Sequence, residues 1–159
     1  MPTGREKRAV TAAPGLAVHG PGTLAKSVLA GAVYFLIVFA AGFGLGTIRV
    51  AWVAPRLGAT AAVLLEAPFM LAASWAACGW CVRRFRMPPA IPARMVMGTV
   101  AFTLLMAAEL GLSLLLFGRP VGEWLADFRT PPGALGLLAQ IAFGLIPLVR
   151  TARAGRRGG

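Results

Sequence analysis

Four long apolar segments, each almost free of charge, constrain this chain more than any other feature. They run from about residue 27 to 53, 59 to 82, 95 to 117 and 133 to 149. A helix that crosses a bilayer needs roughly 20 apolar residues, and about 17 is the lower limit, so the last segment is the shortest that qualifies. The sequence therefore predicts an all-α integral membrane bundle of four transmembrane helices.

The composition supports the same class. Hydrophobic residues make up 58% of the 159 residues and charged residues only 13%, about half the share of a soluble domain. The net charge is +11, but the basic residues lie at the ends of the apolar segments and no nucleic-acid motif is present. The predicted partners are therefore the lipid bilayer and, through the basic termini, anionic lipid headgroups, and not nucleic acid.

The distribution of lysine and arginine predicts the orientation. With four crossings, twelve of these residues belong to the two tails and the second connection, and four belong to the first and third connections. Because the cytoplasmic side carries the excess, both termini are expected in the cytoplasm of a bacterial inner membrane. The twelve are Arg5, Lys7, Arg8, Lys26, Arg83, Arg84, Arg86, Arg94, Arg150, Arg153, Arg156 and Arg157, and the four are Arg49, Arg56, Arg119 and Arg129.

Three regions lie outside the predicted spans. Residues 1–26 lack apolar periodicity and are expected to be a disordered tail, as are the last residues of the basic tail at 150–159. Apolar residues recur with helical spacing at about 121–129, which predicts a short amphipathic helix in the membrane interface. Glu123 and Asp127 are four residues apart on this helix, and we interpret them as a solvated face rather than a cation site.

Each predicted span carries one strongly polar residue at a similar depth. At 1.5 Å per residue, Glu66 and Gln140 lie roughly 10 Å from the outer membrane surface and Glu109 roughly 9 Å from it. Arg49 ends the first apolar run on the same side. The sequence thus predicts an intramembrane polar layer of Arg49, Glu66, Glu109 and Gln140 in the outer third of the bundle.

Small residues and a proline indicate how this layer is oriented. Gly42 and Gly46 precede Arg49 on one helical stripe, and Gly136 and Gly144 flank Gln140 on another. Small residues mark close helix approach, so both polar side chains are expected inside the bundle. Pro68 leaves the carbonyl of Leu64 without its helical donor, which adds an acceptor near Glu66.

One arginine cannot balance two ionised carboxylates. The simplest expectation is that Arg49 pairs with either Glu66 or Glu109, and that the other acid is protonated or hydrated. A carboxylate in a medium of low dielectric constant takes up a proton more readily, which is what a proton carrier requires. The alternative is that the layer only holds the helices together.

Other candidate chemistry is sparse. Cys78 and Cys81 form a CxxC, but they belong to the expected cytoplasmic end, where thiols stay reduced, and no second pair exists. We interpret them as packing residues, so membrane thiol redox chemistry is not favoured. His19 is the only histidine, and no metal or cofactor motif is present, so we expect neither metal nor cofactor and no enzymatic activity.

Three stretches, LGTIRVAWVAPRLG, VLLEAPFMLAASWAACGW and FRTPPGALGLLAQIAFGLIPL, resemble a group of short four-helix bacterial inner-membrane proteins. The likeness spans about residues 26–149 and includes Arg49, Glu66 and the turn at residues 129–131. It implies four helices with both termini inside and brings no established activity.

Two functions remain open from the sequence. The first is a structural or accessory multi-pass membrane protein, as a homo-oligomer or as a subunit of a larger complex, supported by the small-residue faces. The second is a proton-coupled carrier of a small solute that uses Glu66 and Glu109.

Overall fold

The computed structural model describes residues 21–155, and this part of the chain is helical apart from short connections, with no strand. A five-residue π-helical turn, η1, links the first two α-helices. The elements in chain order are α1 (Pro21–Ile48), η1 (Arg49–Val53), α2 (Ala54–Leu57), α3 (Ala59–Arg84), α4 (Ile91–Leu115), α5 (Val121–Asp127) and α6 (Pro131–Gly155).

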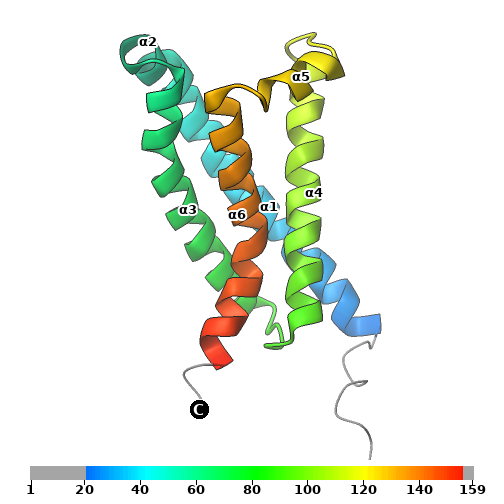
Figure 1. Ribbon diagram of the computed structural model, residues 1–159. Coiled ribbons are helices and arrows are strands. Elements are labelled where there is room, and N and C mark those ends of the chain that lie inside the picture. The colour runs from blue at the N-terminus through cyan, green and yellow to red at the C-terminus, as the bar shows by residue number, and fades with distance from the viewer. Residues whose placement is uncertain (1–20, 156–159) are drawn as a thin grey trace, which may run out of the picture.

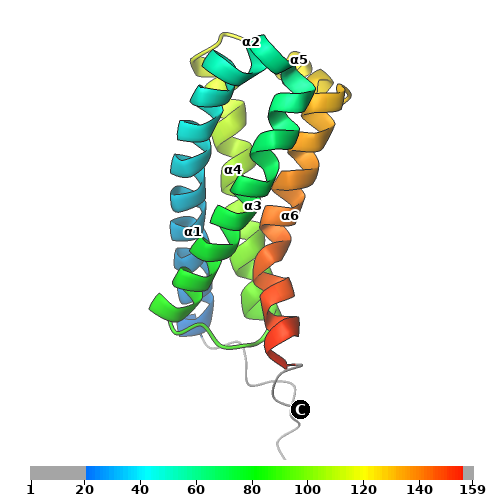
Figure 2. The same cartoon turned by 90° about the vertical axis from the view of Figure 1, so that its left-hand side faces the viewer.

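The four long helices form one bundle in which each has two main neighbours. Helix α1 packs against α3 and α4, and α6 packs against the same two helices from the other side. The start of α1, the end of α6 and the α3–α4 connection lie at one end of the bundle, here called the terminal end (Figure 1, Figure 2). Helices α2 and α5 lie at the opposite, distal end. The predicted all-α four-helix bundle is therefore confirmed.

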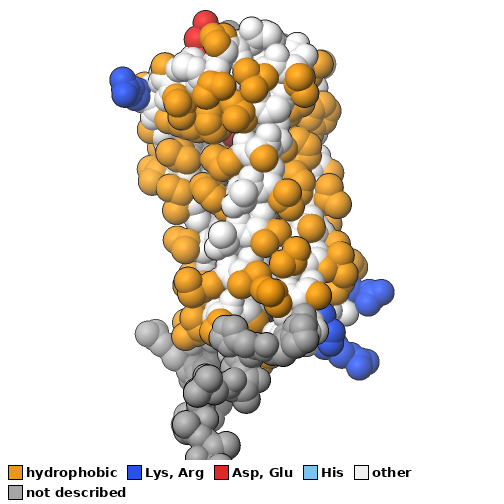
Figure 3. Space-filling model, turned by 90° about the vertical axis from the view of Figure 1, so that its right-hand side faces the viewer, with side chains coloured by type: hydrophobic (Ala, Val, Ile, Leu, Met, Phe, Trp, Pro, Cys, Tyr) orange, Lys and Arg blue, Asp and Glu red, His pale blue; other side chains and the backbone are white. Residues whose placement is uncertain are grey.

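The surface of the bundle is that of a membrane protein. Four helical stretches are long and apolar enough to cross a bilayer. Large apolar side chains such as Leu36, Phe69 and Leu138 point outward, whereas the interior holds many small residues. On the face shown in Figure 3, orange and white side chains cover the middle of the molecule, and blue and red ones gather toward its two ends. Outward apolar side chains with small residues inside are the arrangement expected in lipid. The four stretches are Gly22–Leu57, Ala59–Arg84, Ile91–Leu115 and Pro131–Arg153.

The first helix continues past Pro55, where the sequence predicted that it would end. A proline ring in a helix clashes with the carbonyl four residues earlier, here that of Ala51. The chain widens into η1 just before this point, and the N–H of Ala54 bonds to the carbonyl of Arg49 five residues back. The helix then ends at Leu57, and Gly58, with a φ of 81°, makes the sharp turn into α3.

Both tails are more helical than expected. Pro21–Lys26 form the first turns of α1, so the prediction that they are disordered is wrong. Helix α6 likewise continues through Arg150 to Gly155, because no helix-breaking residue follows Pro147. Residues 1–20 and 156–159 lie outside the described residues, and they include His19 and five of the twelve basic residues on the expected cytoplasmic side. The expected interfacial helix is present as α5, at Val121–Asp127.

The bundle is tightly packed only in the half nearer its terminal end. Glycines allow the closest approaches there. A Cβ on Gly31 of α1 would lie 2.6 Å from the carbonyl oxygen of Met97, and one on Gly98 of α4 would collide with the carbonyl oxygen of Gly144 in α6. Helix α4 is therefore clamped between α1 and α6. The buried apolar core of this half is Ala30, Tyr34, Val38, Ala77, Cys78, Cys81, Met87, Ala93, Met97, Ala101, Phe143 and Ile146.

A buried hydrogen bond closes the centre of this packed half. Pro147 is fully buried in α6 and has no N–H, so the carbonyl of Phe143 lacks its helical donor. The hydroxyl of Tyr34 in α1 donates to that carbonyl at 3.0 Å, and its ring stacks on that of Phe143 with centroids 4.5 Å apart. Helices α1 and α6, which lie diagonally across the bundle, are thus joined next to the more open distal half.

Candidate functional site

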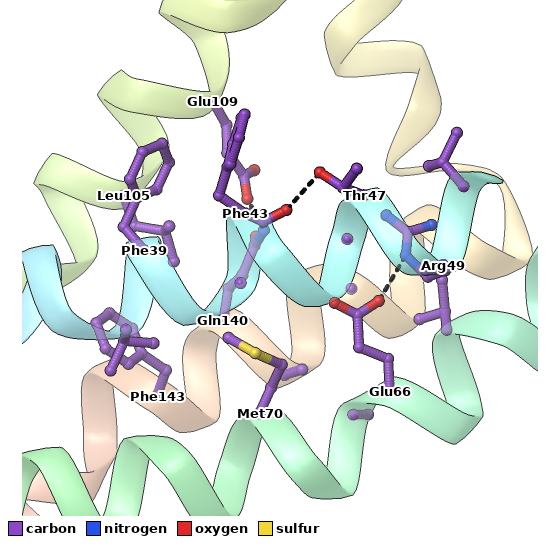
Figure 4. Close-up of a pocket in the computed structure, with 18 of the residues that line it drawn as sticks. Phe39, Phe43, Thr47, Arg49, Glu66, Met70, Leu105, Glu109, Gln140 and Phe143 are labelled. Carbon is purple, nitrogen blue, oxygen red and sulfur yellow. Dashed lines mark hydrogen bonds and ion pairs between the residues drawn. The ribbon is translucent and has the colours of Figure 1, made fainter. Parts of the chain in front are cut away.

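The distal half of the bundle contains a partly open cavity of about 630 Å³. All four long helices and η1 line it, and the rings of Phe39, Phe43 and Phe143 form part of its apolar wall (Figure 4). Its floor is the packed half, since Val38, Ser74 and Phe143 are buried there and also line the cavity. All four residues of the predicted polar layer contribute to its lining: Arg49, Glu66, Glu109 and Gln140.

Arg49 pairs with Glu66. The Nε of Arg49 lies 2.5 Å from the carboxylate of Glu66, and the two side chains are 31% and 18% exposed (Figure 4). The Nε–H does not point along a hydrogen-bond direction, so this contact is an ion pair rather than a well-aligned hydrogen bond. Arg49 is the first residue of the π-helical turn η1. The sequence left open which acid pairs with Arg49, and the structure assigns Glu66.

Glu109 takes a different partner. The side-chain amide of Gln140 in α6 donates to its carboxylate at 2.6 Å. The other end of that amide, the carbonyl oxygen Oε1 of Gln140, is buried and has no hydrogen-bond partner. Because an amide is uncharged, Gln140 does not compensate the negative charge that Glu109 carries when it is ionised. The layer therefore divides into an ion pair and an acid–amide pair, both in the lining of the cavity.

A second cavity, of about 540 Å³, adjoins the first toward the distal end. Arg49, Glu109 and Gln140 line both cavities, so the polar layer forms the boundary between them. Trp124 of α5 lines the outer cavity, and so does Phe128, the residue that directly follows this helix. The apolar side of α5 is thus split between the bundle and its surroundings, because Val121 and Leu125 of the same helix are exposed.

Arg119 fixes α5 at the mouth of the outer cavity. Its guanidinium donates two hydrogen bonds to the carboxylate of Asp127, at 2.7 and 3.0 Å, and a longer one to Glu123 at 3.3 Å. These hydrogen bonds lower the pKa of Asp127 and raise the pKa of Arg119. The side chains of Glu123 and Asp127 are 58% and 46% exposed, as expected of a solvated face, and both also accept from Arg119.

The turn after α5 is also well defined. Thr130 caps α6: its hydroxyl oxygen accepts the backbone N–H of Gly133 at 3.2 Å, behind the two prolines that open the helix. The same hydroxyl donates to the backbone carbonyl of Asp127 at 2.7 Å. A Cβ on Gly133 would collide with that carbonyl, so the end of α5 is held closely against the start of α6.

The small-residue stripes play a different part from the one expected. Gly46 and Gly136 have no neighbour within 4 Å of an added Cβ, and both line the inner cavity. They create space instead of marking close helix approach, so that part of the prediction is wrong. Gly144 does pack closely, against Phe102 of α4, and Gly42 faces the end of Met70. Arg49 and Gln140 nevertheless point into the bundle as expected.

The two cysteines lie in the packed half, away from both cavities. Cys78 and Cys81 are free and fully buried. Beside them are two arginines that the sequence analysis did not single out. Arg94 is buried and donates to the carbonyls of Met87 and Pro88. Arg150 donates to the carbonyl of Trp75 at 3.0 Å and lies over its ring. The available signal for Arg94 was its position directly before a predicted span.

Among residues 21–155, no three histidine, cysteine, aspartate or glutamate side chains gather closely enough to hold a metal ion. The charged and amide side chains that line the inner cavity are those of Arg49, Glu66, Glu109 and Gln140. Comparisons with protein-family models, with curated proteins and with solved structures found no match for this chain.

Proposed function

We propose that this protein is a proton-coupled carrier of a small solute. The observation that supports this most is the 630 Å³ cavity, which lies within the membrane-spanning part and is lined by two acids. Its volume is in the range of about 300–1,000 Å³ typical of small-molecule sites. A protein whose polar layer served only to hold helices together would be expected to fill this space with side chains.

The shape of the bundle fits one state of an alternating-access cycle. The half toward the distal end contains the cavities, and the half toward the terminal end is closed by Tyr34, Met97 and Phe143. A carrier must open the closed half and close the open one around the same site. In our proposal, Glu109 exchanges protons during this cycle, and Arg49 is the counter-charge of Glu66.

The proposed location is the bacterial inner membrane, with both termini in the cytoplasm. The support is the uneven division of lysine and arginine between the two sides, together with the position of the two described ends of the chain at one end of the bundle. Reporter fusions test this. Fusions after Arg86 and after Gly159 should report the cytoplasm, and one after Gly122, in α5, should report the periplasm. A periplasmic signal after Gly159 would remove the fourth crossing.

The decisive test of the carrier is proton flux in vesicles. Purified protein reconstituted into liposomes should move protons when a candidate solute gradient is imposed, as read by a pH-sensitive dye trapped inside. Glu109→Gln should abolish this flux while the protein remains folded, and Glu66→Gln should reduce it. Glu123→Gln is the matched control because it removes an acid outside the cavities. Equal flux in Glu109→Gln and wild type would refute the proposal.

A second candidate function is an accessory subunit of a larger membrane complex. One feature favours it: Ala40 and Gly44 form a small-xxx-small pair on the exposed face of α1. No atom of another helix within residues 21–155 lies within 4 Å of a Cβ added to Gly44. Such pairs let a second helix approach closely in a bilayer. Purification in mild detergent tests this idea: a stoichiometric partner that is lost in Gly44→Leu supports a subunit, whereas a lone chain or homo-oligomer opposes it.

A further inference from the structure

The charges around the inner cavity do not cancel. Arg49 forms its ion pair with Glu66, while the side-chain hydrogen bond to Glu109 comes from the uncharged amide of Gln140. Arg49 also attracts Glu109 at longer range, but one positive charge cannot balance two ionised acids. At the outer cavity, Arg119 is already engaged by Asp127. The wall of the inner cavity therefore carries one uncompensated negative charge when both of its acids are ionised. In a medium of low dielectric constant, such a carboxylate needs a proton or a cation.

Glu109 and Gln140 lie in the wall of the inner cavity, where the amide nitrogen of Gln140 donates to the carboxylate. Oε1 of the same amide is buried and has no hydrogen-bond partner among the described residues. A buried acceptor without a partner costs free energy. A ligand that supplies N–H groups would recover this cost if it replaced the amide as donor to Glu109 and the amide turned its oxygen toward the ligand.

The remaining wall selects against a bare metal ion. Aliphatic and aromatic side chains surround the acid, among them Phe39, Phe43 and Leu105 (Figure 4). Hard metal ions require six or more oxygen ligands, which this wall does not supply. Aromatic rings do attract organic cations through their negatively charged faces. The cavity is also far larger than one ion.

We infer that the cavity binds a small lipophilic ammonium ion, that is, a protonated amine with an apolar body, whose N–H groups bond to Glu109 and Gln140. This inference rests on the proposed function, because it names the solute of the proposed carrier. The ammonium and a proton would neutralise the same carboxylate, so one proton leaves Glu109 for each cation that enters when the acid starts protonated. Arg49 and Glu66 are the other charged groups that face this cavity, and as an ion pair they leave the exchange to Glu109.

Equilibrium binding to the purified full-length protein in detergent tests the inference. Three fluorescent probes share one naphthalene body and differ in the polar group: 1-naphthylmethylammonium, 1-naphthalenemethanol and 1-naphthylacetate. The ammonium probe should bind about tenfold or more tightly than the alcohol, and the carboxylate probe should bind more weakly than either. Binding of the ammonium probe should weaken as the pH falls, because protons compete with it for Glu109. Equal binding of the ammonium and the alcohol would overturn the inference, as would a preference for the carboxylate probe.

Variants assign the effect to the proposed groups. Glu109→Gln should remove most of the advantage of ammonium over alcohol, and Gln140→Leu should reduce it, while Glu123→Gln should leave it unchanged. If Glu109→Gln does not fold, the probe series on the wild-type protein still decides. Competition by sodium ions as strong as by the ammonium probe would also contradict the inference.

The two proposals can fail separately. Selective ammonium binding without proton flux in vesicles would reject the carrier and leave the ligand class in place. Proton flux driven by other solutes, without ammonium binding, would keep the carrier and reject the ligand class.

Discussion

The guanidinium of Arg49 lies 2.5 Å from the carboxylate of Glu66, whereas Glu109 on the neighbouring wall is bound by Gln140. One arginine thus faces two acids and makes an ion pair with only one of them. This division decides which acid is free to take part in exchange, and it can be measured.

We predict that Arg49→Ala and Glu66→Gln are coupled in a double-mutant cycle. Removing Arg49 leaves a partly buried carboxylate without its counter-charge. Such losses cost about 3–5 kcal/mol in soluble cores, but polar contacts within membranes average near 0.6 kcal/mol, and the partial exposure of Arg49 favours the lower part of this range. Detergent unfolding should therefore show the double variant to be more stable than the sum of the two single changes implies.

Two comparisons control this cycle. Arg56→Ala, which removes an exposed arginine near the distal end, should cost less than Arg49→Ala. The cycle of Arg49→Ala with Glu109→Gln should be closer to additive than the cycle with Glu66→Gln. Stronger coupling to Glu109 would mean that the assigned pairing is wrong.

The contact between Tyr34 and Phe143 gives a second prediction. Tyr34→Phe removes the donor to the buried carbonyl of Phe143 and should lower the free energy of unfolding by about 1–3 kcal/mol. Pro147→Ala restores a backbone N–H that can bond to the same carbonyl. Tyr34→Phe should therefore cost less in the Pro147→Ala background. An equal cost in both backgrounds would show that the hydroxyl does not compensate for the proline.

The glycines of α4 provide a third prediction with a matched control. In Gly98→Ala, the new methyl group would collide with the carbonyl of Gly144, so the variant should lose about 1–3 kcal/mol of stability. Gly111→Ala lies on the same helix with open space around the new group, and should be neutral or gain up to about 1 kcal/mol from helix propensity. Thermal unfolding in one detergent compares the two, and equal stability would contradict the close approach of α4 and α6.

A fourth prediction concerns pH and the mouth of the outer cavity. Hydrogen bonds from Arg119 lower the pKa of Asp127 below its ordinary value. The contact is therefore fully present above that ordinary value, about 3.9, and is lost as the pH falls through the lowered folded-state pKa. The protection factors of the amides in Val121–Asp127, that is, the intrinsic exchange rate at each pH divided by the observed rate, should fall at acidic pH, and Asp127→Asn should lower them at pH 7.

Glu123→Gln is the control for this prediction. Its single contact with Arg119 is longer than the two that Asp127 makes, so it should change exchange less than Asp127→Asn. Protection factors in α5 that do not change with pH in the wild-type protein would show that the Arg119–Asp127 pair does not hold the helix.

The cysteines give a fifth prediction. Cys78 and Cys81 are fully buried in the packed half, so a maleimide reagent should label them only after unfolding. Changing both cysteines to alanine should lower the free energy of unfolding by roughly 1 kcal/mol per substitution and leave transport intact. Rapid labelling of the native protein, or loss of function at normal membrane levels, would support a thiol reaction instead.

Much of the architecture was predictable from the sequence because a bilayer imposes simple rules. Long uncharged segments must form helices to satisfy their backbone groups, so the fold class followed from the runs themselves. The rise of 1.5 Å per residue also placed Arg49, Glu66, Glu109 and Gln140 at one level, because depth along a helix depends only on residue number. The short helix α5 was visible in its apolar spacing.

Other features depended on how the helices pack. Which acid pairs with Arg49 is decided by rotation and by neighbour order around the bundle, and a residue count contains neither. The same is true of Gly46 and Gly136, which line a cavity, and of Gly98, which permits a close crossing; the three are chemically identical in the sequence. Only the tertiary structure, by packing one half of the bundle and leaving the other hollow, decided where a ligand has room, because empty space is a property of several helices together.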